Sequence, residues 1–184
     1  MEIILHSALI ETPWKNGAGV TREIGSELKD GRYIWRLSMA DVTRDGEFSN
    51  FSGLVRILTV IAGHGMKLIY EDNTLLANPC VPLRFDGNLK IHARLNSGPS
   101  TNLNLMFDPK SCTGEVTSLS GPFLQTLKPT PERTYAVHTL TGMAKFDTNV
   151  RLSPGDTLLL NSKAGQLNLS EGDTALLILV THNA

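Results

Sequence analysis

The sequence is poor in cysteine, which excludes one common way of stabilising a small fold. Its 184 residues include only two cysteines, Cys80 and Cys112, too few for the disulfide framework on which small secreted domains rely. Either cysteine can instead serve as a small buried hydrophobic residue. We therefore expect the protein to reside in the reducing cytoplasm.

Long hydrophobic runs and an excess of charge are missing as well. No segment reaches the roughly 18 apolar residues that a membrane helix needs, and Glu2 and His6 stand where an export signal has a basic region followed by an apolar run. The 17 basic and 18 acidic residues give a net charge of -1, so no global field attracts nucleic acid or an anionic membrane. We expect no export, no nucleic-acid partner and no membrane partner.

Closely spaced histidines are also missing, which bears on metal binding. No histidine stands two residues from another, so one strand cannot present two imidazoles on the same face. We expect no metal and no other cofactor, although a long-range trio of His64, His92 and His138 stays open. Gly17-Ala18-Gly19 opens no helix and lacks the lysine and hydroxyl of a phosphate loop. No serine has the surroundings of a nucleophile elbow.

Helical periodicity is absent, and the pattern that replaces it is typical of β-strands. The segment from Tyr33 to Val42 alternates with a period of two, which predicts a half-buried strand. Further strands are expected at 54–62, 66–70, 74–76, 83–85 and 89–95. Asp86-Gly87-Asn88 between apolar strands predicts a hairpin, and Gly63-His64-Gly65 is interpreted as another hairpin turn.

A weak internal repeat predicts how these strands are organised. Series of hairpins follow Gly63 and Gly142, an offset of 79 residues, and related turns at Gly98 and Gly172 are 74 residues apart. Many short strands with duplication favour two fused jelly-roll barrels over a single sandwich. We expect an all-β protein with an N-terminal barrel at 1–110 and a C-terminal barrel at 111–184, with possible strand exchange between them.

The segment Pro13-Trp14-Lys15-Asn16-Gly17-Ala18-Gly19 is the most informative stretch of the chain. It gathers a lysine, an asparagine amide and flexible glycines beside a tryptophan, and the strands that follow carry arginines. Such a concentration of hydrogen-bond donors near apolar surface suits a small anion. The alternative is that Asn-Gly-Ala-Gly is only a turn, because glycine and asparagine tolerate positive φ.

Together these motifs resemble the HutD/Ves family of bicupins. Ser153-Pro154-Gly155-Asp156 resembles the turn of a cupin's second motif, and the first 60 or so residues carry most of the likeness. The segments that carry it there are Pro13 to Gly17, Thr21 to Ile24, Trp35 to Ser38, Gly46 to Ser49, Gly53 and Arg56. The likeness returns at Asn102-Leu103-Asn104-Leu105-Met106. The sequence departs from the family pattern at Ala18, Glu47 and Asn102, where glycine, proline and aspartate are more usual.

The resemblance implies two cupin barrels, commonly paired as a homodimer, and a regulatory or accessory role in histidine utilisation or stress response. It also implies a small carboxylate ligand, similar to formyl- or formimino-glutamate. A guanidinium pairs well with a carboxylate, and Arg36 is preferred to Arg56 because Ser38 shares its face. The predicted ligand-binding residues are Trp14, Lys15, Asn16, Gly17, Thr21, Arg22, Trp35, Arg36, Ser38, Phe48, Ser49 and Arg56.

Two other functions stay open at this point. The first is an enzyme that acts on such a metabolite by acid/base chemistry through Lys15, Asp41 or Glu23. The second is a structural or protein-partner module in which Trp14 lies in a dimer seam. The apolar C-terminal sequence from Leu158 to Leu160 and from Leu176 to Leu179 suits a filled core, so we expect that barrel to be scaffold.

Overall fold

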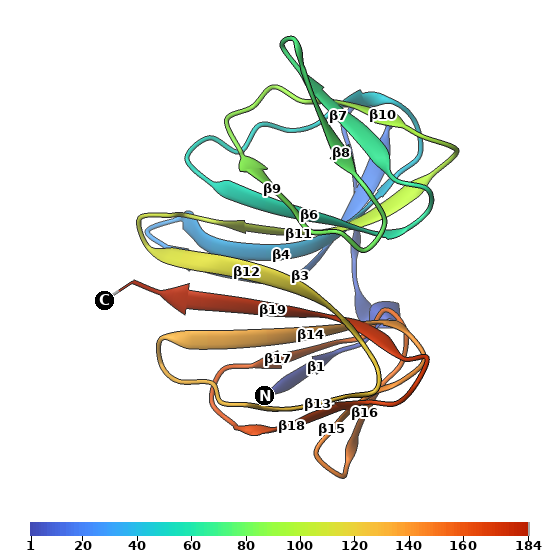
Figure 1. Ribbon diagram of the computed structural model, residues 1–184. Helices are drawn as coiled ribbons and strands as arrows, with labels where there is room; N and C mark the ends of the chain where they lie inside the picture. Colours follow the sequence, from blue (N-terminus) through green and yellow to red (C-terminus); the bar gives the residue numbers. More distant parts are fainter. Residues whose placement is uncertain (184) are drawn as a thin grey trace. The chain divides into compact units, whose positions relative to one another are not determined.

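The computed structural model describes residues 1–183, and its regular structure is almost entirely β-strand (Figure 1). Within these residues the helical structure consists of one 3-10 turn, η1 (His6–Ala8). The strands form two compact units. The N-terminal unit comprises Ile10–Cys112, and the C-terminal unit comprises Met1–Leu9 together with the chain from Thr113 onward.

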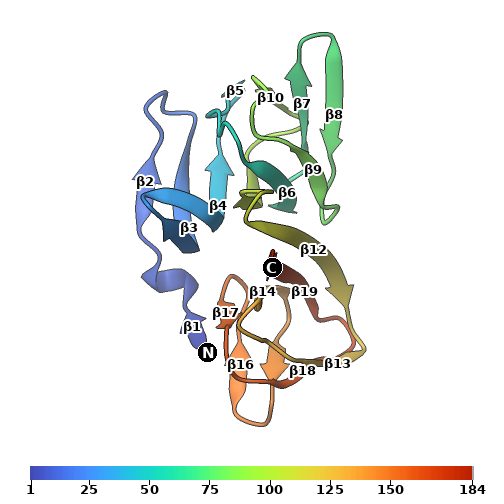
Figure 2. The ribbon, with the colours of Figure 1, turned by 90° about the vertical axis from the view of Figure 1, so that its left-hand side faces the viewer.

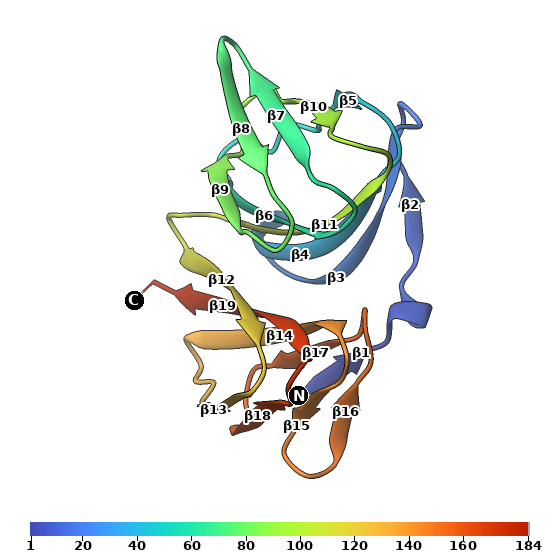
Figure 3. The same ribbon diagram turned by 45° about the vertical axis from the view of Figure 1, so that its right-hand side comes forward.

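The N-terminal unit contains a six-stranded sheet of order β2-β3-β4-β11-β6-β9 and a four-stranded sheet of order β5-β10-β7-β8. Figure 3 shows the curved larger sheet facing strands β7, β8 and β10. The strands are β2 (Glu11–Pro13), β3 (Gly19–Lys29), β4 (Arg32–Val42), β5 (Gly46–Glu47), β6 (Val55–Ala62), β7 (Met66–Tyr70), β8 (Asn73–Ala77), β9 (Leu83–Asp86), β10 (His92–Leu95) and β11 (Ser100–Phe107). Its buried core is Val42, Leu58, Val60, Met66, Leu68, Ala77, Phe85, Ile91 and Ala93.

The C-terminal unit contains a five-stranded sheet of order β1-β17-β14-β19-β12 and a four-stranded sheet of order β13-β18-β15-β16. The strands are β1 (Glu2–Ile4), β12 (Cys112–Ser120), β13 (Phe123–Leu127), β14 (Arg133–Thr141), β15 (Ala144–Phe146), β16 (Val150–Leu152), β17 (Thr157–Leu160), β18 (Gly165–Leu169) and β19 (Thr174–His182). Its core contains Leu119, Leu127, Val137, Ala144, Phe146, Leu152, Leu158, Leu160, Leu167, Leu169 and Ala175.

The strand orders confirm the internal repeat. The N-terminal orders β4-β11-β6-β9 and β5-β10-β7-β8 become β12-β19-β14-β17 and β13-β18-β15-β16 when eight is added to each strand number. The glycines that revealed the repeat, Gly63 and Gly142 in one pair and Gly98 and Gly172 in the other, all have positive φ. Glycine adopts this conformation without a Cβ clash, so equivalent turns preserve it.

The two predicted hairpin turns are wrong, although the strands beside them exist. Gly63-His64-Gly65 leads from β6 to β7, and Asp86-Gly87-Asn88 leads from β9 to β10, yet each turn joins strands of different sheets. Gly87 is required by close packing, because a Cβ there would lie 2.5 Å from the backbone oxygen of Phe51. The strands expected at 66–70 and 74–76 do pair with each other, as the hairpin β7–β8 (Figure 2). Tyr70 lies in register with Asn73 beside its turn.

The first residues of the chain belong to the C-terminal unit, whereas the prediction placed residues 1–110 in one barrel. Strand β1 pairs antiparallel with β17, and Ile3 lies in register with Leu158. The N-terminal unit therefore begins at Ile10. Strand β4, predicted to be half-buried, is buried on both faces, since Leu37 and Met39 on one side and Ser38 and Ala40 on the other are each at most 7 % exposed.

Candidate functional site: a cationic cavity in the N-terminal unit

The floor of a cavity is built from three adjacent strands, β4, β11 and β6. Antiparallel register places Arg36, Met106 and Arg56 side by side across these strands. Directly paired residues point to the same face of a sheet, as do residues two apart in one strand. Ser38 and Asn104, which are also in register, therefore form the next row on that face. A cationic row thus lies beside a neutral polar row.

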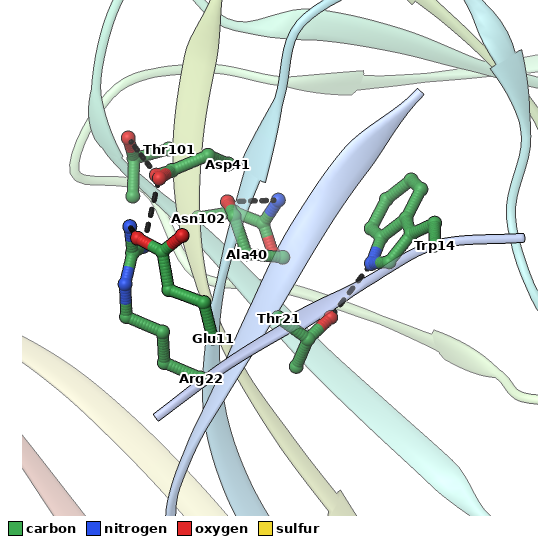
Figure 4. A network of polar contacts seen from close by, with 8 residues as sticks. All are labelled: Glu11, Trp14, Thr21, Arg22, Ala40, Asp41, Thr101 and Asn102. Atoms are coloured by element: carbon green, nitrogen blue, oxygen red, sulfur yellow. Dashed lines mark hydrogen bonds and ion pairs between the residues drawn. The ribbon is translucent and has the colours of Figure 1, made fainter. Parts of the chain in front are cut away.

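A tryptophan forms one wall of the cavity. Trp14 Nε1 donates a hydrogen bond to Thr21 Oγ1 at 2.7 Å (Figure 4), and its ring meets Phe48 edge-on with 5.7 Å between centroids. Thr21 lies in register with Ala40, whose backbone oxygen accepts a hydrogen bond from Asn102 Nδ2 at 3.4 Å. The aromatic wall is therefore held against a third row of the same sheet.

These elements enclose a cavity of about 50 Å³. One water molecule needs about 10–15 Å³ by the same kind of measure, so the cavity accommodates a group of only a few non-hydrogen atoms. The lining residues are Trp14, Thr21, Arg36, Ser38, Ala40, Phe48, Ser49, Phe51, Arg56, Asn102, Asn104 and Met106. An open basin of about 470 Å³ shares Trp14, Phe48 and Ser49 with the cavity and adds Pro13, Lys15, Asn16 and Glu47.

Arg56 is the most unusual group in the cavity, because it is a buried cation surrounded by aromatic rings. Arg56 is only 4 % exposed. The guanidinium carbon lies 5.6, 5.2 and 5.0 Å from the ring centroids of Phe48, Phe51 and Phe85. Nη1 donates a long hydrogen bond of 3.4 Å to the backbone oxygen of Ser49, and Nε has no hydrogen-bond partner within the described chain.

The charge on Arg56 is therefore poorly compensated by the protein. Burial is the main cause that lowers its pKa, and the nearby positive charge of Arg36 lowers it further, to about 10. Arg56 nevertheless stays protonated at neutral pH. Among residues 1–183 no acidic side chain forms a salt bridge with Arg56. A buried charge normally needs a counter-charge, and an anion in the cavity would supply one.

Arg36, the second cation, already has a carboxylate partner. Its Nε donates to Glu23 Oε2 at 2.6 Å, and Glu23 also accepts a hydrogen bond from Ser26 Oγ at 2.8 Å. Burial by itself would raise the pKa of Glu23, but the hydrogen bonds from Arg36 and Ser26 outweigh it and the pKa is lowered. Glu23 is therefore ionised at neutral pH and is a poor general acid. The sequence prediction ranked Arg36 first, whereas the structure makes Arg56 the uncompensated cation.

Seven of the predicted ligand-binding residues line the cavity, and two more line the adjoining basin. Lys15 and Asn16 are the two in the basin. Asn16 also holds its own loop, because its Oδ1 accepts a hydrogen bond from the backbone of Ala18 at 3.0 Å. Ala18 is 2 % exposed and faces no ligand space. The seven cavity residues are Trp14, Thr21, Arg36, Ser38, Phe48, Ser49 and Arg56.

Three predicted residues do not reach the cavity. Trp35 alternates with Arg36 along β4 and so lies on the opposite face, where its Nε1 donates to Glu27 at 2.9 Å. Arg22 lies on that opposite face as well, in register with Met39. Gly17 forms the turn after Trp14, donating its N–H to the oxygen of Trp14 at 2.9 Å.

Arg22 is held by acidic neighbours of its own. Its guanidinium forms ion pairs with Asp41, at 2.7 Å, and with Glu11. Asp41 also accepts a hydrogen bond from Thr101 Oγ1 at 2.8 Å, and Figure 4 shows this group apart from the Trp14–Thr21 pair. The hydrogen bond to Asp41 is the main cause that raises the pKa of Arg22. Asp41 is thus not available as an acid/base group in the cavity.

The predicted ligand-binding set left out several lining residues, chiefly Asn102, Asn104 and Met106 on β11 and Phe51 in the loop before β6. The signal for the first three was present. They alternate with Leu103, Leu105 and Phe107 along β11, and two asparagines in a strand that is otherwise apolar indicate a polar pocket on one face. Phe51 has no such signal.

Metal ligands are not gathered anywhere in the described part of the chain. Within residues 1–183 no three histidine, cysteine, aspartate or glutamate side chains lie close enough together to hold a metal ion. Of the histidine trio that the sequence left open, His64 and His92 belong to the N-terminal unit and His138 to the C-terminal unit. No helix within residues 1–183 has the length and apolar character to span a membrane.

A known protein family and several curated proteins match the sequence of this chain. The family model described as HutD matches residues 6–178. The chain belongs to the HutD family. It is 37 % identical over 103 residues to an uncharacterised 21.2 kDa protein in the hutC 3′ region of Pseudomonas putida, and 35 % identical over 106 residues to protein Ves of Escherichia fergusonii. The chain spans about half the length of these curated relatives, 53 % and 56 % respectively.

Solved structures of the HutD family and of cupins share the fold. HutD from Pseudomonas fluorescens SBW25, in a formate condition, is 27 % identical and has a TM-score of 0.87, with 100 % of this chain and 99 % of that chain covered. A cupin 2 conserved barrel domain protein from Leptotrichia buccalis has a TM-score of 0.59 at 12 % identity, covering 99 % of this chain and 96 % of that one. The predicted two-barrel cupin fold is therefore confirmed.

Proposed function

We propose that this HutD-family protein binds a small carboxylate metabolite in the cavity of the N-terminal barrel, with Arg56 holding the acid group. The observation that carries the proposal is the buried guanidinium of Arg56, which faces the cavity without an acidic partner in the described chain. A carboxylate compensates such a charge and accepts paired N–H bonds from a guanidinium. Low solvent exposure strengthens that interaction.

The size of the cavity limits how much of a ligand it can enclose. About 50 Å³ suits one carboxylate and a short attachment, and a formyl- or formimino-glutamate is larger than that. The remainder of such a ligand would extend into the basin lined by Lys15 and Asn16, which shares Trp14 and Phe48 with the cavity. Lys15 offers a cation for a second carboxylate there.

The names of relatives support a role in histidine utilisation. One curated relative is described by its place in the hutC 3′ region, and HutD from P. fluorescens was solved in a formate condition, formate being the smallest carboxylate. We propose a regulatory or accessory role rather than catalysis, because Glu23, the carboxylate beside the cavity, is paired with Arg36 and has a lowered pKa, which makes it a poor acid at neutral pH and a weak base. The homodimer that the family resemblance implies stays a prediction, which analytical ultracentrifugation tests.

Thermal unfolding in the presence of candidate ligands tests the proposal. Formate, acetate, formylglutamate, formiminoglutamate, urocanate and glutamate are compared at constant ionic strength. A ligand at 100 times its Kd stabilises the native state by about 2.7 kcal/mol. We expect a rise in Tm with at least one of these ligands for the wild type and for Arg32→Met, a control at an exposed residue of β4, but not for Arg56→Met. An unmoved Tm with every compound, or an equal rise in Arg56→Met, would refute the proposal.

A further inference from the structure

Asn104 is a cavity-lining residue with an unpaired hydrogen-bond acceptor. The residue is only 5 % exposed and lines the cavity. Its Oδ1 atom is buried and has no hydrogen-bond partner within residues 1–183. Buried polar side-chain atoms in folded proteins are nearly always paired. An unpaired acceptor beside an uncompensated guanidinium therefore requires an explanation.

The other asparagines near the site show what a structural amide does here. Asn102 donates from Nδ2 to the backbone oxygen of Ala40, and Asn16 accepts from the backbone of Ala18. Asn102 thereby ties β11 to β4, and Asn16 holds its own loop. The Oδ1 atom of Asn104 makes no such connection, although the residue sits in the centre of the sheet. Its Oδ1 therefore has no part in holding the scaffold, and a donor on a ligand in the cavity that the residue lines would satisfy it.

Asn104 and Arg56 stand close enough to share one small ligand. Arg56 is in register with Met106, and Asn104 precedes Met106 by two residues on the same strand and face. Diagonal neighbours of this kind have their Cα atoms about 7–8 Å apart, and both side chains line the same cavity of about 50 Å³. A carboxylate at Arg56 therefore places the next atoms of the ligand beside Asn104.

We infer that the ligand carries an N–H or O–H donor adjacent to its carboxylate, and that Asn104 selects for this donor. The inference rests on the proposed carboxylate site and names the class of acid that fills it: amido, imino, amino or hydroxy acids in preference to plain alkyl or keto acids. A ligand with a donor pairs the buried Oδ1, whereas a ligand without one leaves it unpaired. Pairing a buried acceptor is worth more than a contact at an exposed atom.

Matched pairs of small acids test this selectivity directly. Oxamate and pyruvate differ by an amide NH₂ in place of a methyl group, and glycolate and propionate differ by a hydroxyl in place of a methyl group. Dissociation constants are measured by NMR titration of the full chain, with formate as the reference carboxylate. The same titrations are repeated on Asn104→Leu, which has a similar volume and no polar atoms.

We expect the wild type to bind oxamate and glycolate at least about tenfold more tightly than their methyl counterparts. This preference should vanish or reverse in Asn104→Leu, because an apolar wall favours the methyl group. The wild-type comparison stands without the variant, so the test does not depend on Asn104→Leu folding.

Either of two results with the wild type would overturn the inference and leave the carboxylate site in place. The first is equal or tighter binding of pyruvate and propionate by the wild type. The second is formate binding without binding of any of the four larger acids. A preference that persists unchanged in a folded Asn104→Leu protein would also overturn the assignment to Asn104. If formate and every other carboxylate fail to bind, the proposed function itself is wrong and the inference falls with it.

Discussion

Replacing Arg56 by methionine should stabilise the ligand-free protein, although Arg56 is among the most buried residues of the site. Burial is the main cause that lowers its pKa from the ordinary arginine value to about 10. Each pKa unit corresponds to about 1.36 kcal/mol, so the charged side chain destabilises the native state by about 3 kcal/mol. Because the native pKa is the lower one, this penalty is fully present at every pH below about 10 and disappears as the pH rises from there toward the ordinary pKa of arginine.

The aromatic rings around Arg56 offset part of this gain. A guanidinium over a ring contributes about 0.5–2 kcal/mol, and a thioether near a ring about 0.3–1.5 kcal/mol. Exchanging one for the other at Phe48, Phe51 and Phe85 therefore loses roughly 0.5 kcal/mol per ring. The expected net effect of Arg56→Met is a gain of about 1–2 kcal/mol in the free energy of unfolding, within the range seen when buried charges are replaced by hydrophobic groups.

Urea denaturation followed by tryptophan fluorescence measures this change in the N-terminal unit, to which Arg56 belongs. The chain has two tryptophans, Trp14 and Trp35, and both belong to the N-terminal unit. An unchanged m value would show that the midpoint shift reports stability. Arg32→Met should leave the midpoint nearly unchanged. A loss of 1 kcal/mol or more (about the mean effect of a point mutation) in Arg56→Met would refute the reasoning, because it would show that Arg56 stabilises the empty barrel.

Three further predictions concern other residues. Between pH 6.5 and about 4 the wild type should lose up to roughly 3 kcal/mol of stability through His138, because burial lowers its native pKa to about 4 and the unfolded chain takes up the proton first. The urea midpoints at pH 7.5 and 5 should therefore converge in His138→Gln, and midpoints that stay as far apart as in the wild type would show that the slope arises elsewhere. Formate should change the emission of Trp14 in a Trp35→Phe protein, and an unchanged spectrum together with a measured Tm shift would place the ligand away from the indole. Arg22→Gln should lower stability by about 1–2 kcal/mol through its lost bond to Asp41, while formate affinity stays within about twofold by NMR titration; a larger loss of affinity would bring Arg22 back to the site.

The glycine at position 87 illustrates why local signals predicted strands better than their pairing. Aspartate followed by glycine between apolar strands is typical of a hairpin, and the strands on both sides exist. Their partners, however, lie in different sheets. Gly87 is needed because the backbone oxygens of Phe51 and Leu54 come within 2.6 Å of where its Cβ would be. Such an approach involves residues more than 30 positions away, and no local pattern contains it.

In the candidate site, too, local patterns predicted which face a residue occupies but not which residues pair across strands. Alternation along β4 correctly placed Arg36 and Ser38 on one face and Trp35 on the other, so the inclusion of Trp35 in the site contradicted the pattern that predicted the strand. The choice between Arg36 and Arg56 could not be made from the sequence. It depends on which arginine has Glu23 beside it, and that is a matter of strand register.

The sequence by itself determined the β-rich fold, its duplication and the family, because period-two alternation, turn glycines and short motifs are local properties of the chain. Tertiary structure alone decided which donors face one cavity and which of them lack a partner. Arg56 is a buried cation because Phe51 and Phe85 pack against its guanidinium. Asn104 lies near Arg56 because β11 pairs with β6. Burial and charge compensation are set by groups distant in the chain, and they cannot be assigned until the strands are paired.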